Sequence, residues 1–351
     1  MKNFWQKIEK PILALAPMAG ITDSAFRQIC RRHGADVTYS EMASVSALFY
    51  KPQKTLELVR FNKKERPYVV QLFGNNPEHF AVATKIITKE IKPDGIDINF
   101  GCPAKKVFKH GSGCALMPQI ELAREIISAV CENTNLPVSI KIRAGINPVK
   151  SASGGVATPQ FNGVNALEFI EKTKDLPYCA VMIHGRTYEG GFSGSVDWEI
   201  ISQVKKIIPE KIVLGNGGIT TPEDAVEILQ KYPNLDGLGI ARGAWGKPYL
   251  FEQIKNIHHK NCRGAIHRTL KINADTQGVM NHAPTKEYDF KKIKKIMLEH
   301  AKLIYADKNE MGKLEIRKHL VWYIKGFPGA AELRQKLVRA ESVEEIKEIL
   351  K

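Results

Sequence analysis

Short apolar segments alternate along the chain with segments whose apolar residues recur at helical intervals. Apolar segments such as YVVQLFG are bounded by turn residues, and stretches such as PEHFAVATKIITKEI follow them with helical periodicity. The candidate strands cover 13–18, 36–42, 68–74, 95–102, 137–145, 180–187, 212–219 and 237–244. Eight β-then-α units in succession predict an α/β fold, a TIM (β/α)8 barrel, rather than an open doubly wound sheet.

The pattern changes after the eighth candidate strand. Residues 263–289 are polar and show little periodicity, which predicts an extended or partly ordered connector. Helical periodicity returns at residue 290 and continues to the end of the chain. The predicted organisation is a barrel over residues 1–262, a connector over 263–289 and a smaller all-α helical domain over 290–351.

The chain is strongly basic, with 52 Lys and Arg against 37 Asp and Glu and a formal net charge of +15. This charge favours a polyanionic partner, with nucleic acid ahead of an anionic membrane surface. A Lys-rich composition that reflects an AT-rich genome is the alternative and stays open. In the last helices Trp322, Tyr323 and Phe327 are interleaved with basic residues, which favours an RNA-facing surface over a merely solvated one.

The six cysteines are scattered, without a CxxC pair or a Cys/His spacing typical of zinc sites. The sequence therefore predicts neither structural disulfides nor a metal site. The apolar stretch near the N-terminus is too short, and too interrupted by prolines, for a signal peptide or a membrane span. We expect a cytoplasmic protein without a membrane partner.

Polar or small residues gather at the predicted carboxyl ends of the strands. The carboxyl face of a (β/α)8 barrel carries the active site, so this clustering predicts function rather than packing. Any one of these residues could instead be a satisfied strand-end residue. The residues at this face are Pro17, Met18, Gln71, Asn99, Cys102, Lys141, Arg143, His184, Arg186, Asn216 and Arg242.

Two glycine-containing segments follow the last strands, GNGGI (215–219) and IARGAWG (240–246). Barrels of this class often bind phosphate between these loops, although tight turns need glycine in any case. The chain lacks a strand–GxGxxG–helix unit, so a built-in nicotinamide site is not predicted. A flavin fits better, because Lys141 could stabilise its negative charge, Gln71 could bond the ring edge, and His184 and Arg186 could contact the ring or the phosphate side.

Cys102 follows the fourth predicted strand, between Gly101 and Pro103. A neutral thiol there could donate the proton that completes reduction of a C=C bond. A buried inert thiol and a nucleophile are the alternatives. The next residues include Lys105 and Lys106, a basic segment that suits a substrate carrying phosphates.

Several longer motifs resemble the tRNA-dihydrouridine synthases, nearest to the bacterial DusB-like branch. The resemblance runs from about residue 13 to residue 335, and DINFGCPAKKV, IHGRT and RKHLVWYIKG are its most specific parts. The other matching motifs are APMAGITDSAFR, VVQLFG, IKIRAG, GNGGI and ARGAWGKPYLF.

The resemblance implies an FMN-binding barrel with a tRNA-binding helical domain, with NADPH or NADH as the reductant of FMN, and we expect a monomer. It implies hydride transfer from FMN to C6 of a flipped-out uridine and protonation of C5 by Cys102. The implied FMN residues are Pro17, Met18, Ala19, Gln71, Lys141, His184, Asn216, Gly217, Gly218, Ala241 and Arg242. The substrate residues are Asn99 and Arg143 for uracil, with Arg186, Lys105, Lys106, Lys318 and Lys325 for the rest of the tRNA.

The chain departs from the family pattern in three places. Gly218 and Ala241 stand where relatives usually read GNGD and GR, and the segments 146–163 and 264–288 are longer than usual. We expect FMN to bind despite the first departure, because backbone N–H groups hold the phosphate. Two other functions stay open: a flavin reductase of a free pyrimidine, resembling dihydroorotate dehydrogenases, and a non-catalytic tRNA-binding protein.

Overall fold

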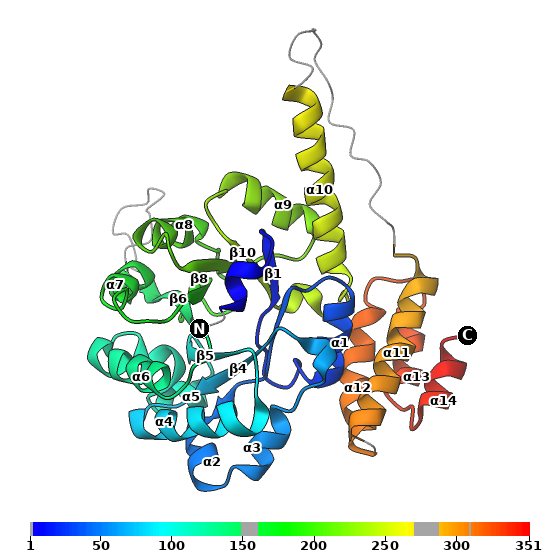
Figure 1. Cartoon of the computed structure of the whole chain (residues 1–351). Helices are drawn as coiled ribbons and strands as arrows, with labels where there is room; N and C mark the ends of the chain where they lie inside the picture. Colours follow the sequence, from blue (N-terminus) through cyan, green and yellow to red (C-terminus); the bar gives the residue numbers. More distant parts are fainter. Residues whose placement is uncertain (1–2, 149–160, 270–287, 309) are drawn as a thin grey trace.

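Eight parallel strands close into a barrel in the computed structural model of the chain, which describes residues 3–148, 161–269, 288–308 and 310–351 (Figure 1). The barrel strands are β1 (Ile12–Leu15), β2 (Val37–Tyr39), β4 (Tyr68–Phe73), β5 (Gly95–Phe100), β6 (Val138–Pro148), β8 (Ala180–Thr187), β9 (Ile212–Asn216) and β10 (Gly237–Ile240). Pairing of β1 with β10 and of β2 with β4 completes the circle. Every predicted strand is present, which confirms the (β/α)8 barrel.

Two further strands lie outside the circle and were not predicted. β3 (Ala43–Ser44) extends the edge of β4 in parallel. β7 (Phe161–Asn165) pairs antiparallel with the end of β6, which runs three residues past its predicted end at 145. The long segment 146–163 therefore begins and ends in a two-stranded extension of the barrel wall, and its residues 149–160 lie outside the described residues.

The helices between the strands cover the outside of the barrel (Figure 1). They are α1 (Ser24–Arg32), α2 (Val45–Tyr50), α3 (Gln53–Leu58), α4 (Pro77–Ile86), α6 (Ile120–Glu132), α7 (Ala166–Glu171), α8 (Trp198–Ile207) and α9 (Pro222–Lys231); the short α5 (Lys105–Lys109) follows the turn after β5, and α10 (Leu250–Thr269) follows the last strand. Side-chain caps set several of their starts: Asp23 accepts from the N–H of Phe26 at α1, and Thr221 forms a capping box at α9. Each helix within the described ranges is too short or too polar to cross a membrane.

The barrel interior is filled by side chains from alternate strand positions. Ala14, Tyr39, Val69 and Met182 pack there with almost no exposure, and Trp5 of the short helix η1 (Phe4–Lys7) packs against the same cluster. A packed interior is typical of barrels of this class. The carboxyl ends of the strands are then the face at which a site can form.

Four helices follow the barrel: α11 (Phe290–Lys308), α12 (Glu310–Tyr323), α13 (Ala330–Leu337) and α14 (Val343–Ile349). We call them the C-terminal helices. They share a hydrophobic cluster with Ala25 and Ile29 of α1, and Figure 1 shows them beside that helix. The smaller all-α part is therefore confirmed. α10 continues to Thr269, past the expected end of the barrel at 262, and residues 270–287 of the expected connector lie outside the described residues.

Gly246 lies where the barrel meets the C-terminal helices. Its φ is +66°, and a Cβ at this position would lie 2.3 Å from the carbonyl carbon of Trp322. Only glycine allows this approach, because any side chain would push α12 away. The close contact brings the end of α12 beside the loop that follows β10.

An ion pair buried beneath α1 gives a stability prediction. Arg27 and Glu65 are fully buried with Nε and Oε2 2.5 Å apart, and Arg27 also donates to the carbonyls of Thr22 and Arg60. Arg27→Met leaves the Glu65 carboxylate buried without its partner, so we expect a loss of about 3–5 kcal/mol in the free energy of unfolding. Urea denaturation measures it. The double variant Arg27→Met/Glu65→Leu serves as the control and should recover much of the loss, whereas a single variant as stable as the wild type would contradict the prediction.

Candidate active site

A line of hydrogen bonds crosses the carboxyl ends of β4 and β5. Gln71 donates from Nε2 to Oδ2 of Asp97 at 2.7 Å, and Asn99 donates from Nδ2 to Oε1 of Gln71 at 2.9 Å. The Oδ1 of Asn99 then accepts from the backbone N–H of Gly101 at 3.0 Å and of Cys102 at 2.9 Å. Asn99 thus holds the turn that carries Cys102, and Gln71 fixes the orientation of the Asn99 amide.

Lys141 lies beside this line, because strand register places it opposite Asn99. Its Nζ donates to Oδ1 of Asn216 at 3.3 Å, and Asn216 donates to the carbonyl of Gly239 at 2.6 Å. Burial, with help from Arg143, lowers the pKa of Lys141 to about 8. Burial also raises the pKa of Asp97 to about 6. Two titrating groups whose pKa values approach neutrality are typical of functional sites.

Three arginines at the same face bind the loop after β8. Arg143 donates from Nη1 to the carbonyls of Thr187 and Gly191, both at 2.8 Å, and from Nε to Gly101 at 3.0 Å. Arg186 donates to the carbonyl of Gly194, and Arg242 donates to the carbonyl of Phe192 at 2.8 Å. These bonds hold residues 187–194 across the mouth of the barrel.

Phe192 is the aromatic residue of this loop. The guanidinium groups of Arg242 and Arg143 lie 4.8 and 5.4 Å from its ring centre, and His184 stacks on it with ring centres 6.4 Å apart. More than half of the Phe192 side chain is exposed. The loop therefore presents an apolar ring to whatever enters the mouth.

The positive charges at the mouth repel one another. Burial, followed by the charge of Arg242, lowers the pKa of Arg186. Burial, followed by the charge of Lys141, lowers the pKa of His184 well below its ordinary value, so this imidazole is neutral. An anion bound among these groups would relieve the repulsion.

Backbone donors at the end of β9 add to this preference for an anion. Gly217 and Gly218 have φ values of +121° and +72°, and within the described part of the chain their N–H groups make no hydrogen bond. A Cβ on Gly217 would lie 2.9 Å from the ring of His184. Successive free N–H groups in such a turn form an anion-binding concavity. The residues present therefore fit a phosphorylated cofactor.

Cys102 is the partly exposed thiol at this face. Burial raises its pKa above the ordinary value, against the opposing charges of Arg143 and Lys141. The thiol is therefore protonated at neutral pH and can donate that proton. Cys114 lies close by, its N–H bonded to the carbonyl of Cys102 at 3.2 Å, but it is fully buried and burial raises its pKa to about 12.

The structure brings the predicted residues of the barrel together at its carboxyl face. Pro17, Met18 and Ala19 follow β1, and the indole N–H of Trp245 points at the Met18 sulfur, 3.0 Å away. Lys105 and Lys106 are exposed on α5, just after the Cys102 turn. Phe108 of the same helix stacks on Tyr188 with ring centres 4.2 Å apart, which ties α5 to the loop after β8.

Two predicted residues lie in the C-terminal part of the chain, Lys318 on α12 and Lys325 in the turn just after it. Lys318 lies on α12 with its Nζ 3.5 Å from a carboxylate oxygen of Glu315. The Nζ of Lys325 lies 5.4 Å from the ring centre of Trp322. Trp322 in turn contacts Trp245 with ring centres 4.8 Å apart. Aromatic contacts therefore connect the mouth to the basic end of α12.

Sequence reasoning missed four residues of this arrangement: Asp97, Ser139, Phe192 and Trp245. Ser139 donates to Oδ1 of Asp97 at 2.6 Å, so it holds the carboxylate that orients Gln71. Asp97 could have been found as the single acid in an otherwise apolar strand, GIDINF. Trp245 lies within the matched motif ARGAWG, but its partners become visible only in the fold.

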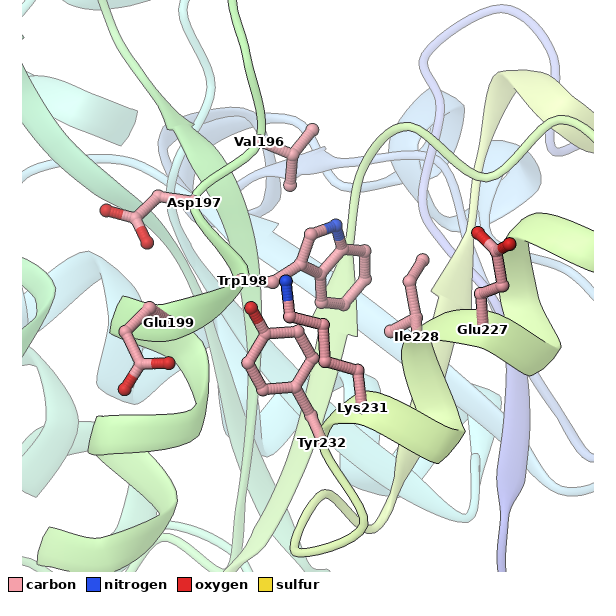
Figure 2. A pocket seen from close by; sticks show the side chains of 8 residues that line it. All are labelled: Val196, Asp197, Trp198, Glu199, Glu227, Ile228, Lys231 and Tyr232. Atoms are coloured by element: carbon pink, nitrogen blue, oxygen red, sulfur yellow. The ribbon is translucent and has the colours of Figure 1, made fainter. Parts of the chain in front are cut away.

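A cavity of about 360 Å³ lies elsewhere, on the outside of the barrel between α8 and α9 (Figure 2). Trp198, Glu227 and Tyr232 line it, and its lining includes none of the predicted site residues. The ring of Trp198 packs against Gly215, where a Cβ would lie 2.2 Å from it. This hollow is a gap between two outer helices rather than part of the mouth.

The closed parallel barrel and the titrating, cationic cluster at its carboxyl face define a (β/α)8-barrel enzyme with a positively charged mouth. The chain belongs to the dihydrouridine synthase family, because the family model described as dihydrouridine synthase (Dus) matches residues 14–351. The predicted family is thereby confirmed.

Relatives cover nearly the whole chain. The tRNA-dihydrouridine synthase B of Pseudomonas aeruginosa is 32% identical over 333 residues, which is 95% of this chain and 89% of that protein. A probable tRNA-dihydrouridine synthase of Aquifex aeolicus is 30% identical over 96% of this chain and 94% of its own length. Among solved structures, a 2-naphthoyl-CoA reductase complex has a TM-score of 0.49 and 11% identity over 72% of this chain and 50% of that one, too distant for a comparison of residues.

Proposed function

We propose that this protein is a tRNA-dihydrouridine synthase, which reduces the C5=C6 bond of a uridine in tRNA to 5,6-dihydrouridine. The observation that carries the proposal is the protonated Cys102 thiol, held by Asn99 at a cationic barrel mouth that continues into the basic C-terminal helices. The reaction needs a proton donor, a hydride from a cofactor that an anion-binding face could hold, and basic residues that bind RNA.

The cofactor proposed for the mouth is FMN, with NADPH or NADH as its reductant. The N–H groups of Gly217 and Gly218, with Arg242, would hold the phosphate. Lys141, Gln71 and Asn216 would face the ring system from the strand ends, where Lys141 supplies a positive charge. FMN bound by these residues would supply the hydride for C6 of the uracil.

Cys102 would give its proton to C5 of the base. Asn99 positions this thiol, because its Oδ1 accepts from the Cys102 N–H. Arg143 spans the mouth between the Cys102 turn and the loop after β8, through bonds to Gly101 and Thr187. It would thus keep the acid and the loop at a constant separation while the base enters.

A uridine stacked inside tRNA cannot reach the strand ends, so it has to be extruded. Phe192 and the partly exposed aromatic path of Trp245 and Trp322 offer rings on which bases can stack. Lys105 and Lys106 are exposed on α5, and Lys325 lies beside the Trp322 ring; all three would bind phosphates. The site thus favours a polynucleotide over a free pyrimidine.

The test uses the full-length protein with FMN, NADPH and tRNA isolated from cells that lack dihydrouridine. We expect dihydrouridine in the tRNA digest, detected by mass spectrometry as a gain of two hydrogen atoms on one nucleoside. Equal reduction of free uracil or orotate would favour a small-molecule reductase. A protein that binds tRNA but takes up no FMN would be a non-catalytic binding protein. Either result contradicts the proposal.

Charge reversal on the C-terminal helices tests the tRNA surface. Lys318→Glu/Lys325→Glu should weaken tRNA binding and lower the slope of log K against log salt by about 1 for each lysine that contacts a phosphate. Filter binding over a salt series measures this. Lys89→Glu is the control, since Lys89 is highly exposed after α4, at the amino ends of the strands. An unchanged slope in the double variant, or an equal change in the control, would refute the proposed surface.

A further inference from the structure

Three buried side chains meet between α1 and the C-terminal helices without satisfying one another. They are Asp23 at the start of α1, His300 on α11 and His319 on α12, and none is more than 4% exposed. One potential ligand atom from each lies within 4.8 Å of the other two. The cluster lies outside the barrel mouth and takes no part in the proposed reaction.

Each member of the cluster has a polar atom without a hydrogen-bond partner. These atoms are Oδ2 of Asp23, Nε2 of His300 and Nε2 of His319. Buried polar atoms in native proteins almost always have a partner, so three orphans at one place require an explanation. A proton shared between Asp23 and His319, whose atoms lie 3.4 Å apart, would leave the His300 nitrogen unsatisfied. A bound cation would satisfy all three atoms together.

Two of the three members are held by a second partner, as the ligands of metal sites commonly are. Nδ1 of His300 lies 3.1 Å from the hydroxyl of Tyr323, and Oδ1 of Asp23 accepts from the N–H of Phe26 at 2.9 Å. Ligands of protein-bound metals are commonly fixed in this way by a second partner. Phe26 packs against both imidazole rings, with ring centres 5.8 and 5.4 Å away. The ligand atoms are thus held in place by neighbours that do not compete for the metal.

The charge around the cluster allows a divalent cation. Oδ2 of Asp23 lies 3.4 Å from Nε2 of His319, so a carboxylate faces the two imidazoles, which ligate metals in their neutral form. Lys308 approaches Oδ2 of Asp23 to 4.0 Å, but its charge is matched by Glu315 at 2.6 Å. Asp23 therefore keeps a negative charge for a cation.

We propose that Asp23, His300 and His319 form a zinc site that fastens the C-terminal helices to the barrel, with a water as the fourth ligand. Two imidazoles and one carboxylate are ligands that Zn²⁺ takes at tetrahedral sites, whereas Mg²⁺ and Ca²⁺ prefer oxygen alone. Asp23 closely follows the turn that carries Met18, so zinc would link α11 and α12 to the edge of the mouth. This inference departs from the expectation of no metal, which rested on cysteine spacing, and it is independent of the proposed reaction.

The experiment measures zinc binding by the full-length protein, freed of any affinity tag and stripped with a chelator. Titration of Zn²⁺ in competition with a chromophoric chelator, and metal analysis after gel filtration, should give one zinc per chain. Co²⁺ in its place should give the intense visible absorption of four-coordinate cobalt. A wild-type chain that retains no zinc, or cobalt with only the weak six-coordinate spectrum, overturns the proposal.

Variants identify the ligands. Asp23→Asn keeps a side chain able to cap α1 but removes the charge. The double variant Asp23→Asn/His319→Asn should lower zinc affinity by about 100-fold or more. Tyr323→Phe removes only the partner of His300 and should cost about 10–100-fold. His259→Asn is the matched control, because His259 is exposed on α10 beside His258, where zinc could bind adventitiously. Zinc lost in this control and kept in His319→Asn overturns the assignment. If a ligand variant fails to fold, zinc binding by Tyr323→Phe and by the wild type still tests the proposed site.

Discussion

Cys102→Ala should slow uridine reduction by about 10²–10⁴-fold, the usual contribution of a positioned general acid. The substitution removes the proton donor and leaves the Asn99 bond to the backbone of residue 102 intact. We therefore expect unchanged affinity for FMN and tRNA, so that the loss appears in the rate of the chemical step. Single-turnover formation of dihydrouridine, measured after prior reduction of the cofactor, separates this step from binding.

Cys114→Ala is the matched control for this experiment. The two cysteines are neighbours, but Cys114 is fully buried whereas Cys102 is partly exposed. Burial raises the pKa of Cys102, and a thiol donates only below its pKa, so the wild-type rate should hold at neutral pH and fall as alkaline pH removes the proton. A wild-type rate in Cys102→Ala, or an equal loss in Cys114→Ala, would exclude Cys102 as the acid.

The barrel could be predicted because its signals are local. Each apolar strand is followed by a helix of clear periodicity, and closure into a circle follows from the number of such units. β3 was missed because a two-residue strand has no periodicity of its own. β7 was missed because it pairs antiparallel with an extension of β6, a contact set by three-dimensional approach.

The site was predictable only as far as strand ends indicate a common face. Pairing of β4 with β5 puts Gln71 beside Asp97, and pairing of β5 with β6 puts Asn99 beside Lys141. The pairing of neighbouring strands brings these residues within hydrogen-bond distance, and the sequence of one strand does not reveal its neighbour or its register. Asp97 was therefore overlooked, although it orients Gln71.

Contacts between segments far apart in the chain could not be predicted from the sequence. Phe192 reaches Arg242 and Arg143 because the loop after β8 folds over the mouth, and its sequence carries no sign of that path. Asp23 meets His319 only because α12 packs beside α1. Sequence spacing indicates metal ligands only where they are close together in the chain, whereas Asp23, His300 and His319 belong to three separate helices.

Lys141→Met should lower the rate of uridine reduction by about 10²–10³-fold, comparable with the loss of one preorganised donor at a developing charge. It should also weaken FMN binding, because the mouth loses a largely buried positive charge. Burial lowers the pKa of Lys141 to about 8, so its positive charge is present below that pH and lost above it. In the wild type FMN affinity should therefore fall as pH rises through that value. In Lys141→Met the same rise should leave the affinity nearly constant.

Fluorescence titration of FMN on either side of that pKa measures both effects. Lys211→Met is the matched control, since Lys211 is another buried lysine but lies at the amino end of β9, where it donates to the carbonyls of Leu176 and Tyr178. It should cost stability without changing the pH dependence of FMN binding. If loss of any buried lysine changed FMN binding, the pH dependence of FMN affinity would change in both variants, which would contradict the prediction. A role of Lys141 at the cofactor requires that this pH dependence disappears in Lys141→Met and persists in Lys211→Met.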